Sequence, residues 1–191
     1  MRRLARFHQL LLRVIAATGL AVLMVFSGLF APQAMARDES ACAAAAVVQN
    51  AARDLMRAGR TGSPARIRRA LNRHVNMRRV MSFALGREIR RLRGRQRQSY
   101  YRKGSEYAAR KLASLARSVR GSRLEIVRCR GNRVETRLLP NGERIVWKLR
   151  GGRIVDVNFR GVWMALLLRD HFRRMWRRAG NDTEAFLAQL N

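Results

Sequence analysis

The sequence predicts an α+β domain in which helices come first, a four-stranded antiparallel meander follows, and helices close the chain. Two observations support this class. From residue 38 to about residue 119, apolar residues recur at three- and four-residue steps, the period of a helix. From Leu124 the period changes to two, and turn-forming residues separate the alternating runs. Since consecutive strands joined by tight turns pair with one another, we expect one sheet with helices packed on one face.

The first 36 residues are typical of a secretory signal. Met1–Arg13 contains four arginines and no acid, Val14–Phe30 is apolar, and Ala34-Met35-Ala36 fits the small-x-small rule of signal peptidase. We predict cleavage after Ala36, which leaves residues 37–191 as a single domain. The alternative is a retained membrane anchor, because the apolar run approaches the length of a short membrane span.

Four helices are expected before the sheet. The first covers Asp38–Ala58, and the second begins at Ser63-Pro64, a cap residue followed by proline at the first helical position. Asn76 is expected to cap a third helix, Met77–Leu92. A long fourth helix covers Arg95–Val119. The residues expected on the buried faces of the second and fourth helices are Ile67, Ala70, Leu71, Tyr100, Tyr107, Leu112, Leu115 and Val119.

The sheet is expected from four alternating runs separated by turn signals. The runs are Leu124–Cys129, Arg133–Leu139, Ile145–Leu149 and Ile154–Phe159, and the turns are Gly131-Asn132, Pro140-Asn141-Gly142 and Gly151-Gly152. Alternation in the last hairpin places three residues of each strand on the same face. These are Ile145, Trp147 and Leu149, opposite Val155, Val157 and Phe159.

Two helices are expected after the sheet. Val162–Ala179 begins almost wholly apolar, and Gly180 ends it. Asn181 followed by Glu184 fits a capping pattern for a last helix, Asp182–Leu190.

The charge balance is strongly basic. The formal net charge is +29, and residues 1–36 contribute four of these charges, which leaves +25 on residues 37–191. Such a balance points to nucleic acid, an anionic membrane or an acidic partner. The arginines are spread over every expected element, and export makes nucleic acid the least favoured partner. Tyr100, Tyr101 and Tyr107 lie among basic residues, but helical spacing makes Tyr100 and Tyr107 core residues first.

Catalytic patterns are weak. His74 and His171 lie in different helices, Asp170 points away from its neighbour His171 on a helix, and the 12 acidic residues are scattered. We therefore predict a protein that is not an enzyme and has neither a metal site nor a cofactor. Asp156 lies inside a strand and is expected to pair with an arginine. Cys42 and Cys129 are the only cysteines, and an exported chain meets oxidising conditions; they form either a disulfide or two separate thiols.

Several ordered segments carry a resemblance to a known family. They are Val80-Met81-Ser82-Phe83-Ala84-Leu85-Gly86-Arg87, Gln96-Arg97-Gln98-Ser99-Tyr100-Tyr101, Arg153-Ile154-Val155-Asp156-Val157 with Gly161-Val162-x-Met164, and Asp170-His171-Phe172. In this order, from about residue 40 to the end of the chain, the sequence resembles the MlaC (toluene-tolerance) family. The sequence differs from the family at the bulky residues Trp163 and Leu166-Leu167-Leu168, where the family often has small or polar side chains.

The resemblance implies an NTF2-like cone and a periplasmic carrier that hands a phospholipid, or a hopanoid-like lipid, to membrane-bound components of a lipid ABC transport system. An acyl chain needs an apolar cavity lined from both a sheet and its covering helices. The predicted lipid-binding set is Val80, Phe83, Ala84, Tyr107, Leu112, Val134, Ile145, Trp147, Val155, Val157, Val162, Met164 and Leu167. The same residues are equally compatible with a filled core. The alternative function is a non-enzymatic basic periplasmic module that binds anionic polymers or membrane surfaces.

Overall fold

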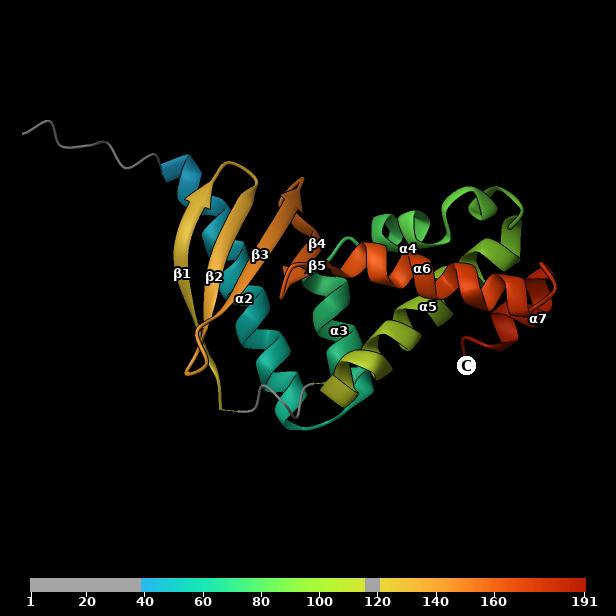
Figure 1. The fold of residues 1–191 in the computed structure, drawn as a ribbon, viewed down its shortest axis with the longest axis horizontal. Coiled ribbons are helices and arrows are strands. Elements are labelled where there is room, and N and C mark those ends of the chain that lie inside the picture. The colour runs from blue at the N-terminus through green and yellow to red at the C-terminus, as the bar shows by residue number, and fades with distance from the viewer. Residues whose placement is uncertain (1–38, 116–120) are drawn as a thin grey trace, which may run out of the picture. The chain divides into compact units, whose positions relative to one another are not determined.

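The computed structural model describes residues 39–115 and 121–191, with side chains described from residue 43 onward. These residues belong to one compact unit, and the predicted signal segment lies outside them. Figure 1 shows the order of the elements along the chain. The helices before the sheet are α2 (Glu39–Arg60), α3 (Pro64–His74), α4 (Met77–Leu85), a 3₁₀ helix (Gly86–Arg90) and α5 (Gly94–Leu115). The strands are β1 (Arg123–Arg130), β2 (Arg133–Leu139), β3 (Glu143–Arg150), β4 (Arg153–Phe159) and β5 (Val162–Trp163), and α6 (Met164–Arg178) and α7 (Thr183–Ala188) close the chain.

The α+β class and the order of helices, meander and helices are confirmed. The sheet has five strands in the order β1-β2-β3-β4-β5, with every neighbouring pair antiparallel. The sequence pattern does not predict the fifth strand, because the apolar run that begins at Val162 is typical of a helix. Arg160 and Gly161 both have positive φ, which closes a two-residue turn and pairs Phe159 with Val162.

The last long hairpin has the predicted register over most of its length. Ile145 lies opposite Phe159 and Trp147 opposite Val157. A bulge between Lys148 and Leu149 then brings Ile154, rather than Val155, opposite Leu149. The predicted pairing of Val155 is therefore wrong, since the bulge adds one residue to the alternation.

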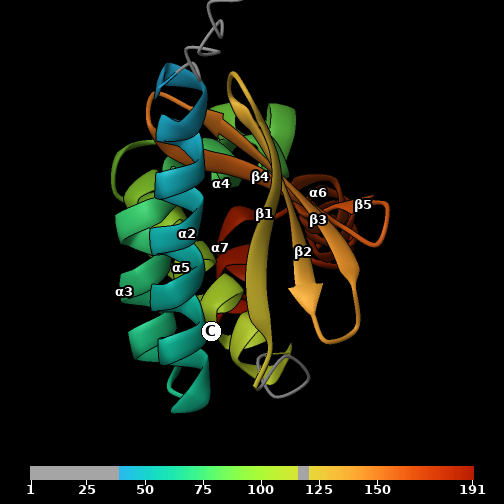
Figure 2. The same ribbon diagram turned by 90° about the vertical axis from the view of Figure 1, so that its left-hand side faces the viewer.

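Helix α2 covers one face of the sheet and forms the sheet core with it. Figure 2 shows α2 running alongside β1, which it contacts. The buried members are Ala45, Val48, Ala51, Val134, Leu138, Ile145, Trp147, Leu149 and Ile154. The buried hydroxyl of Thr136 on this face accepts a hydrogen bond of 2.9 Å from Nε1 of Trp147, so the buried indole N–H has a partner.

A second cluster, the helical core, lies among α3 to α7. Tyr100, Phe172 and Phe186 are fully buried there with their rings in edge and tilted contacts. The Tyr100 hydroxyl donates to the carbonyl of Met81 at 2.8 Å. The link to the sheet is made where α3 ends, since the amide of Asn76 donates to the carbonyl of Ile154 at 2.8 Å.

Three helix predictions need correction. The predicted helix Met77–Leu92 ends at Leu85, because Gly86 has φ +65. The chain then continues as the 3₁₀ helix Gly86–Arg90. The last helix is capped by Asp182, whose carboxylate accepts from the amide of Ala185 at 2.8 Å, rather than by Asn181.

The third correction concerns α5, whose buried residues are Tyr100, Gly104, Ser105 and Ala109. Leu112 and Leu115 are 36% and 61% exposed, although helical periodicity predicted that they would be buried. Periodicity identifies the apolar face of a helix but not the length over which other elements cover it.

Candidate functional site

The predicted lipid-binding set occupies three environments. Ala84, Val134, Ile145 and Trp147 are buried; Val80, Tyr107, Val155, Val157 and Met164 are half-buried; Phe83, Leu112, Val162 and Leu167 are exposed. The buried members are divided between the two cores: Ala84 belongs to the helical core and the other three to the sheet core. The structure therefore does not bring the whole set into one cluster.

Two exposed members of the predicted set, Val162 and Leu167, lie at the β5–α6 junction or in the first turn of α6, and Leu166, which is outside that set, is exposed there as well. Val162 is 46% exposed, Leu166 50% and Leu167 51%, and Phe83 on the neighbouring helix α4 is 40% exposed. We call these four residues the apolar set. Val162 and Leu166 are four residues apart at the β5–α6 junction, and α4 packs against α6. Large apolar side chains left in water in this way mark surfaces that bind a ligand, a protein or a membrane.

Asp156 fixes where α6 begins. Its carboxylate Oδ1 accepts hydrogen bonds from the amide of Val157 at 2.9 Å and from the amide of Ala165 at 3.0 Å. Trp163, the residue that precedes the helix, makes no capping hydrogen bond with its side chain, so β4 supplies the cap. The prediction that Asp156 pairs with an arginine is wrong, since no ion pair of the described residues includes it. The Asp156 carboxylate instead holds the first turn of α6 against the sheet.

Arg169 lies on α6 beside the apolar set. Its guanidinium carbon is 5.1 Å from the centre of the Phe83 ring, and the group lies against Gly86. Its Nε is buried and has no hydrogen-bond partner among the described residues. Sequence reasoning missed Arg169, because nothing in the pattern distinguishes it from the other arginines of α6.

Tyr107, a half-buried member of the lipid-binding set, contacts His171 rather than Phe83 or Val162. The Tyr107 hydroxyl and Nε2 of His171 are within hydrogen-bond distance, and the rings stack with their centres 5.6 Å apart. Burial lowers the pKa of His171, and the positive charges of Arg174, Lys111 and Arg178 lower it further. The tautomer of the His171 ring decides which of the two groups donates this hydrogen bond. Asp170 takes no part in this pair.

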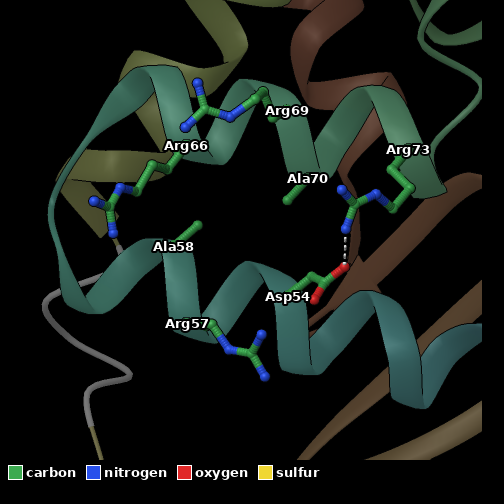
Figure 3. Close-up of a pocket in the computed structure, with 7 residues that line it drawn as sticks. All are labelled: Asp54, Arg57, Ala58, Arg66, Arg69, Ala70 and Arg73. Carbon is green, nitrogen blue, oxygen red and sulfur yellow. Dashed lines mark hydrogen bonds and ion pairs between the residues drawn. The ribbon is translucent and has the colours of Figure 1, made fainter.

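A cavity of ≈ 180 Å³ between α2 and α3 forms what we call the basic groove (Figure 3). It is lined by Asp54, Arg57, Ala58, Arg66, Arg69, Ala70 and Arg73. Asp54 accepts from Nε2 of His74 at 2.7 Å and from Arg73 at 3.0 Å, and the hydrogen bond from His74 is the main cause of its lowered pKa. Arg57, Arg66 and Arg69 make no ion pair within the described part of the chain. Sequence reasoning missed this grouping, since α2 and α3 come together only in the fold.

A second cavity of ≈ 260 Å³ lies between the start of α2 and two turns of the sheet. Its lining includes Ala44, Val47, Leu149 and the turn residues Gly131 and Gly151. Neither of these two cavities contains a member of the lipid-binding set.

The disulfide predicted between Cys42 and Cys129 involves one side chain that the structure describes. Cys129 is half-buried on β1, whereas the side chain of Cys42 lies outside the described residues, so their disulfide stays a prediction.

Within residues 39–115 and 121–191, no helix is both long and apolar enough to cross a membrane. Over the same ranges, no three His, Cys, Asp or Glu side chains are grouped so that they could hold a metal ion.

The protein therefore has an α+β fold in which helices are followed by an antiparallel meander and two closing helices. Residues 44–191 match the family model described as MlaC protein, and the chain belongs to that family. A solved structure with the same fold is a phospholipid-binding protein from Ralstonia solanacearum, determined in complex with a phospholipid. It superposes with a TM-score of 0.62 at 16% sequence identity, covering 76% of this chain and 93% of that one. Comparison with curated protein sequences gave no match.

Proposed function

We propose that this protein is a periplasmic phospholipid carrier that makes and breaks no bond. It binds the lipid tails between the sheet core and the helical core and passes the lipid between membrane-bound components of a lipid ABC transport system. The observation that supports this most is the apolar set, which leaves four large side chains in water in a chain of the MlaC family. The phospholipid bound by the Ralstonia solanacearum protein of the same fold supports it as well.

The two cores offer tails a route into the protein. They are separate apolar clusters that both contact Val75. The half-buried residues Val80 and Tyr107 pack against the helical core, and Val157 packs against the sheet core. Each methylene that moves from water into such a region gains about 0.8 kcal/mol. Long tails are therefore held without any hydrogen bond, and the apolar set is covered by the ligand rather than by water.

Mass spectrometry of organic extracts from the purified mature protein tests this function. We expect a phospholipid in stoichiometric amount, with a hopanoid-like lipid as the alternative ligand of the same site. Mature protein purified from the periplasm without detergent, found free of lipid and unable to take lipid up from vesicles, would contradict the proposal.

Export is part of the same proposal. Residues 1–36 have the features of a signal peptide, and cleavage after Ala36 would release the carrier into the periplasm. N-terminal sequencing of the exported protein should begin at Arg37. Material that is embedded in the membrane and still begins at Met1 would show a retained anchor instead.

The basic groove favours a second candidate function, a non-enzymatic module that binds anionic polymers or membrane surfaces. Three arginines without an ion-pair partner among the described residues line one cavity, and such a group attracts phosphate or sulfate esters. A soluble polyanion that binds the lipid-free protein tightly, while extracts contain no lipid, would favour this function over carriage.

A further inference from the structure

We propose that Arg169 binds the phosphate of the carried lipid at the apolar set, so that this residue selects phosphate-bearing lipids. The inference rests on the proposed carrier function and names the group within it that recognises the head of the ligand.

The position of Arg169 on α6 places its charge next to apolar side chains. It follows Leu166 by three residues on α6, a spacing that puts these two side chains on one face of the helix. Its side chain reaches across to α4, where the guanidinium carbon is 5.1 Å from the centre of the Phe83 ring. It also lies over Gly86, which has no side chain to displace it. The guanidinium is thus held in place by packing before any ligand binds.

The hydrogen bonding of Arg169 is incomplete. Among the described residues four arginines are half-buried: Arg68, Arg110, Arg153 and Arg169. Arg68 donates to Glu106, Arg110 to the carbonyl of Leu190, and Arg153 to the carbonyl of Asn72. Arg169 alone of these four has no hydrogen-bond or ion-pair partner within the described residues, and its Nε is buried. A buried donor without an acceptor costs free energy, which an incoming anion recovers.

The surroundings identify the anion as the head of an amphiphile. A guanidinium donates two parallel N–H groups to the oxygens of a phosphate, which is the geometry that arginine serves best. Phe83 and Leu166 beside it are 40% and 50% exposed and suit the glycerol and first methylenes of an acyl chain. A free phosphate would use the charge but leave these apolar side chains in water. A phospholipid satisfies both.

The experiment compares two lipids that share their acyl chains, a fluorescent phosphatidylglycerol and the matching diacylglycerol. Binding to the lipid-free mature protein is measured for the wild type, Arg169→Gln, Arg169→Lys and a control, Arg173→Gln. Arg173 is exposed one turn further along α6, so it carries the same charge without the packed position. Inorganic phosphate is titrated as a third probe, and thermal melts report the fold of each variant.

We expect Arg169→Gln to weaken phosphatidylglycerol binding about tenfold or more while leaving diacylglycerol binding within about twofold. Arg169→Lys should recover part of the loss, and Arg173→Gln should change neither lipid. Unchanged phosphatidylglycerol binding in Arg169→Gln would overturn the inference and leave the carrier function intact. Equal loss of both lipids would overturn it too, since Arg169 would then only support Phe83. Tight binding of inorganic phosphate by a wild type that binds neither lipid would overturn the carrier function itself, and this inference with it.

Discussion

Asp156 and Ala165 join the sheet to α6, the helix that carries two of the four residues of the apolar set. The Asp156 carboxylate on β4 accepts the amide proton of Ala165 in the first turn of α6, at a distance of 3.0 Å. The capping group thus comes from a different element, nine residues earlier in the chain. This bond sets the direction in which α6 leaves the sheet, and with it the positions of Leu166 and Leu167.

Asp156→Ala should destabilise the protein by about 1 kcal/mol, within a range of roughly 0.5 to 2, because the first turn of α6 loses its cap. Urea unfolding of the mature protein measures the change. Asp170→Ala is the matched control, since Asp170 is exposed on the same helix and should be nearly neutral. Equal effects of the two substitutions would mean that net charge, rather than the cap, determines the loss.

Val162→Glu should leave the protein folded and remove most of its lipid. Val162 is 46% exposed, so a carboxylate there remains hydrated in the lipid-free protein but meets the apolar ligand when lipid binds. Val127→Glu is the control, since Val127 on β1 is 51% exposed and lies outside the predicted set. Lipid counts are read beside thermal melts.

Two results would count against the site at Val162. If Val162→Glu unfolds while Val127→Glu does not, the side chain belongs to a filled core. If both variants keep their lipid, the lipid lies elsewhere.

The Tyr107–His171 pair should make stability depend on pH. Burial lowers the pKa of His171 in the folded protein below its ordinary value of 6.5, so the unfolded chain takes up the proton first. The free energy of unfolding should fall as the pH is lowered through 6.5 and below, and level off once the folded pKa is passed. His171→Gln keeps a hydrogen-bonding side chain but does not titrate. The difference between wild type and His171→Gln, measured by denaturation from pH 8 to pH 5, should shrink as the pH falls; a difference independent of pH would refute the assignment.

A disulfide between Cys42 and Cys129 should join α2 to β1, two elements that contact one another. We expect the exported protein to lack free thiols and to gain two hydrogens on reduction, which intact mass spectrometry detects. Cys42→Ser with Cys129→Ser should lower stability by about 2 to 4 kcal/mol, since a long loop loses its crosslink. Two thiols that react with an alkylating reagent in the native exported protein would show that the bond is absent.

Docking onto anionic vesicles should fall steeply between low and high salt, whereas lipid already bound should stay bound. Each basic residue near the membrane contributes up to about 1 kcal/mol, and the attraction fades beyond about 8 Å at physiological salt. Arg66→Gln with Arg69→Gln in the basic groove should weaken docking more than Arg128→Gln with Arg137→Gln on the sheet. Vesicle sedimentation across a salt series, with retained lipid counted in the supernatant, measures both. Docking that does not depend on salt concentration would refute the electrostatic explanation. Lipid that is lost in parallel with docking would show that the lipid is bound to the basic surface.

Local chemistry in the sequence determined the elements and several of their ends. Ser63 and Asn76 cap α3 and α4 as predicted, because a cap depends on residues two or three positions away. The strand Arg133–Leu139 has the predicted bounds, and Gly151 and Gly152 both take the positive φ that a tight hairpin needs. Period, caps and turns act over a few residues, so one sequence is enough to predict them.

Contacts between distant segments decided the rest. The bulge at Leu149, the exposure of Leu112 and the amide that Asp156 caps all depend on which element lies opposite. Arg169 shows this most clearly: with 41 basic residues in the chain, sequence alone cannot distinguish it. Only the packing of α6 against α4 buries its Nε away from an acceptor, because burial and hydrogen bonding are properties of the neighbours that a side chain meets in space.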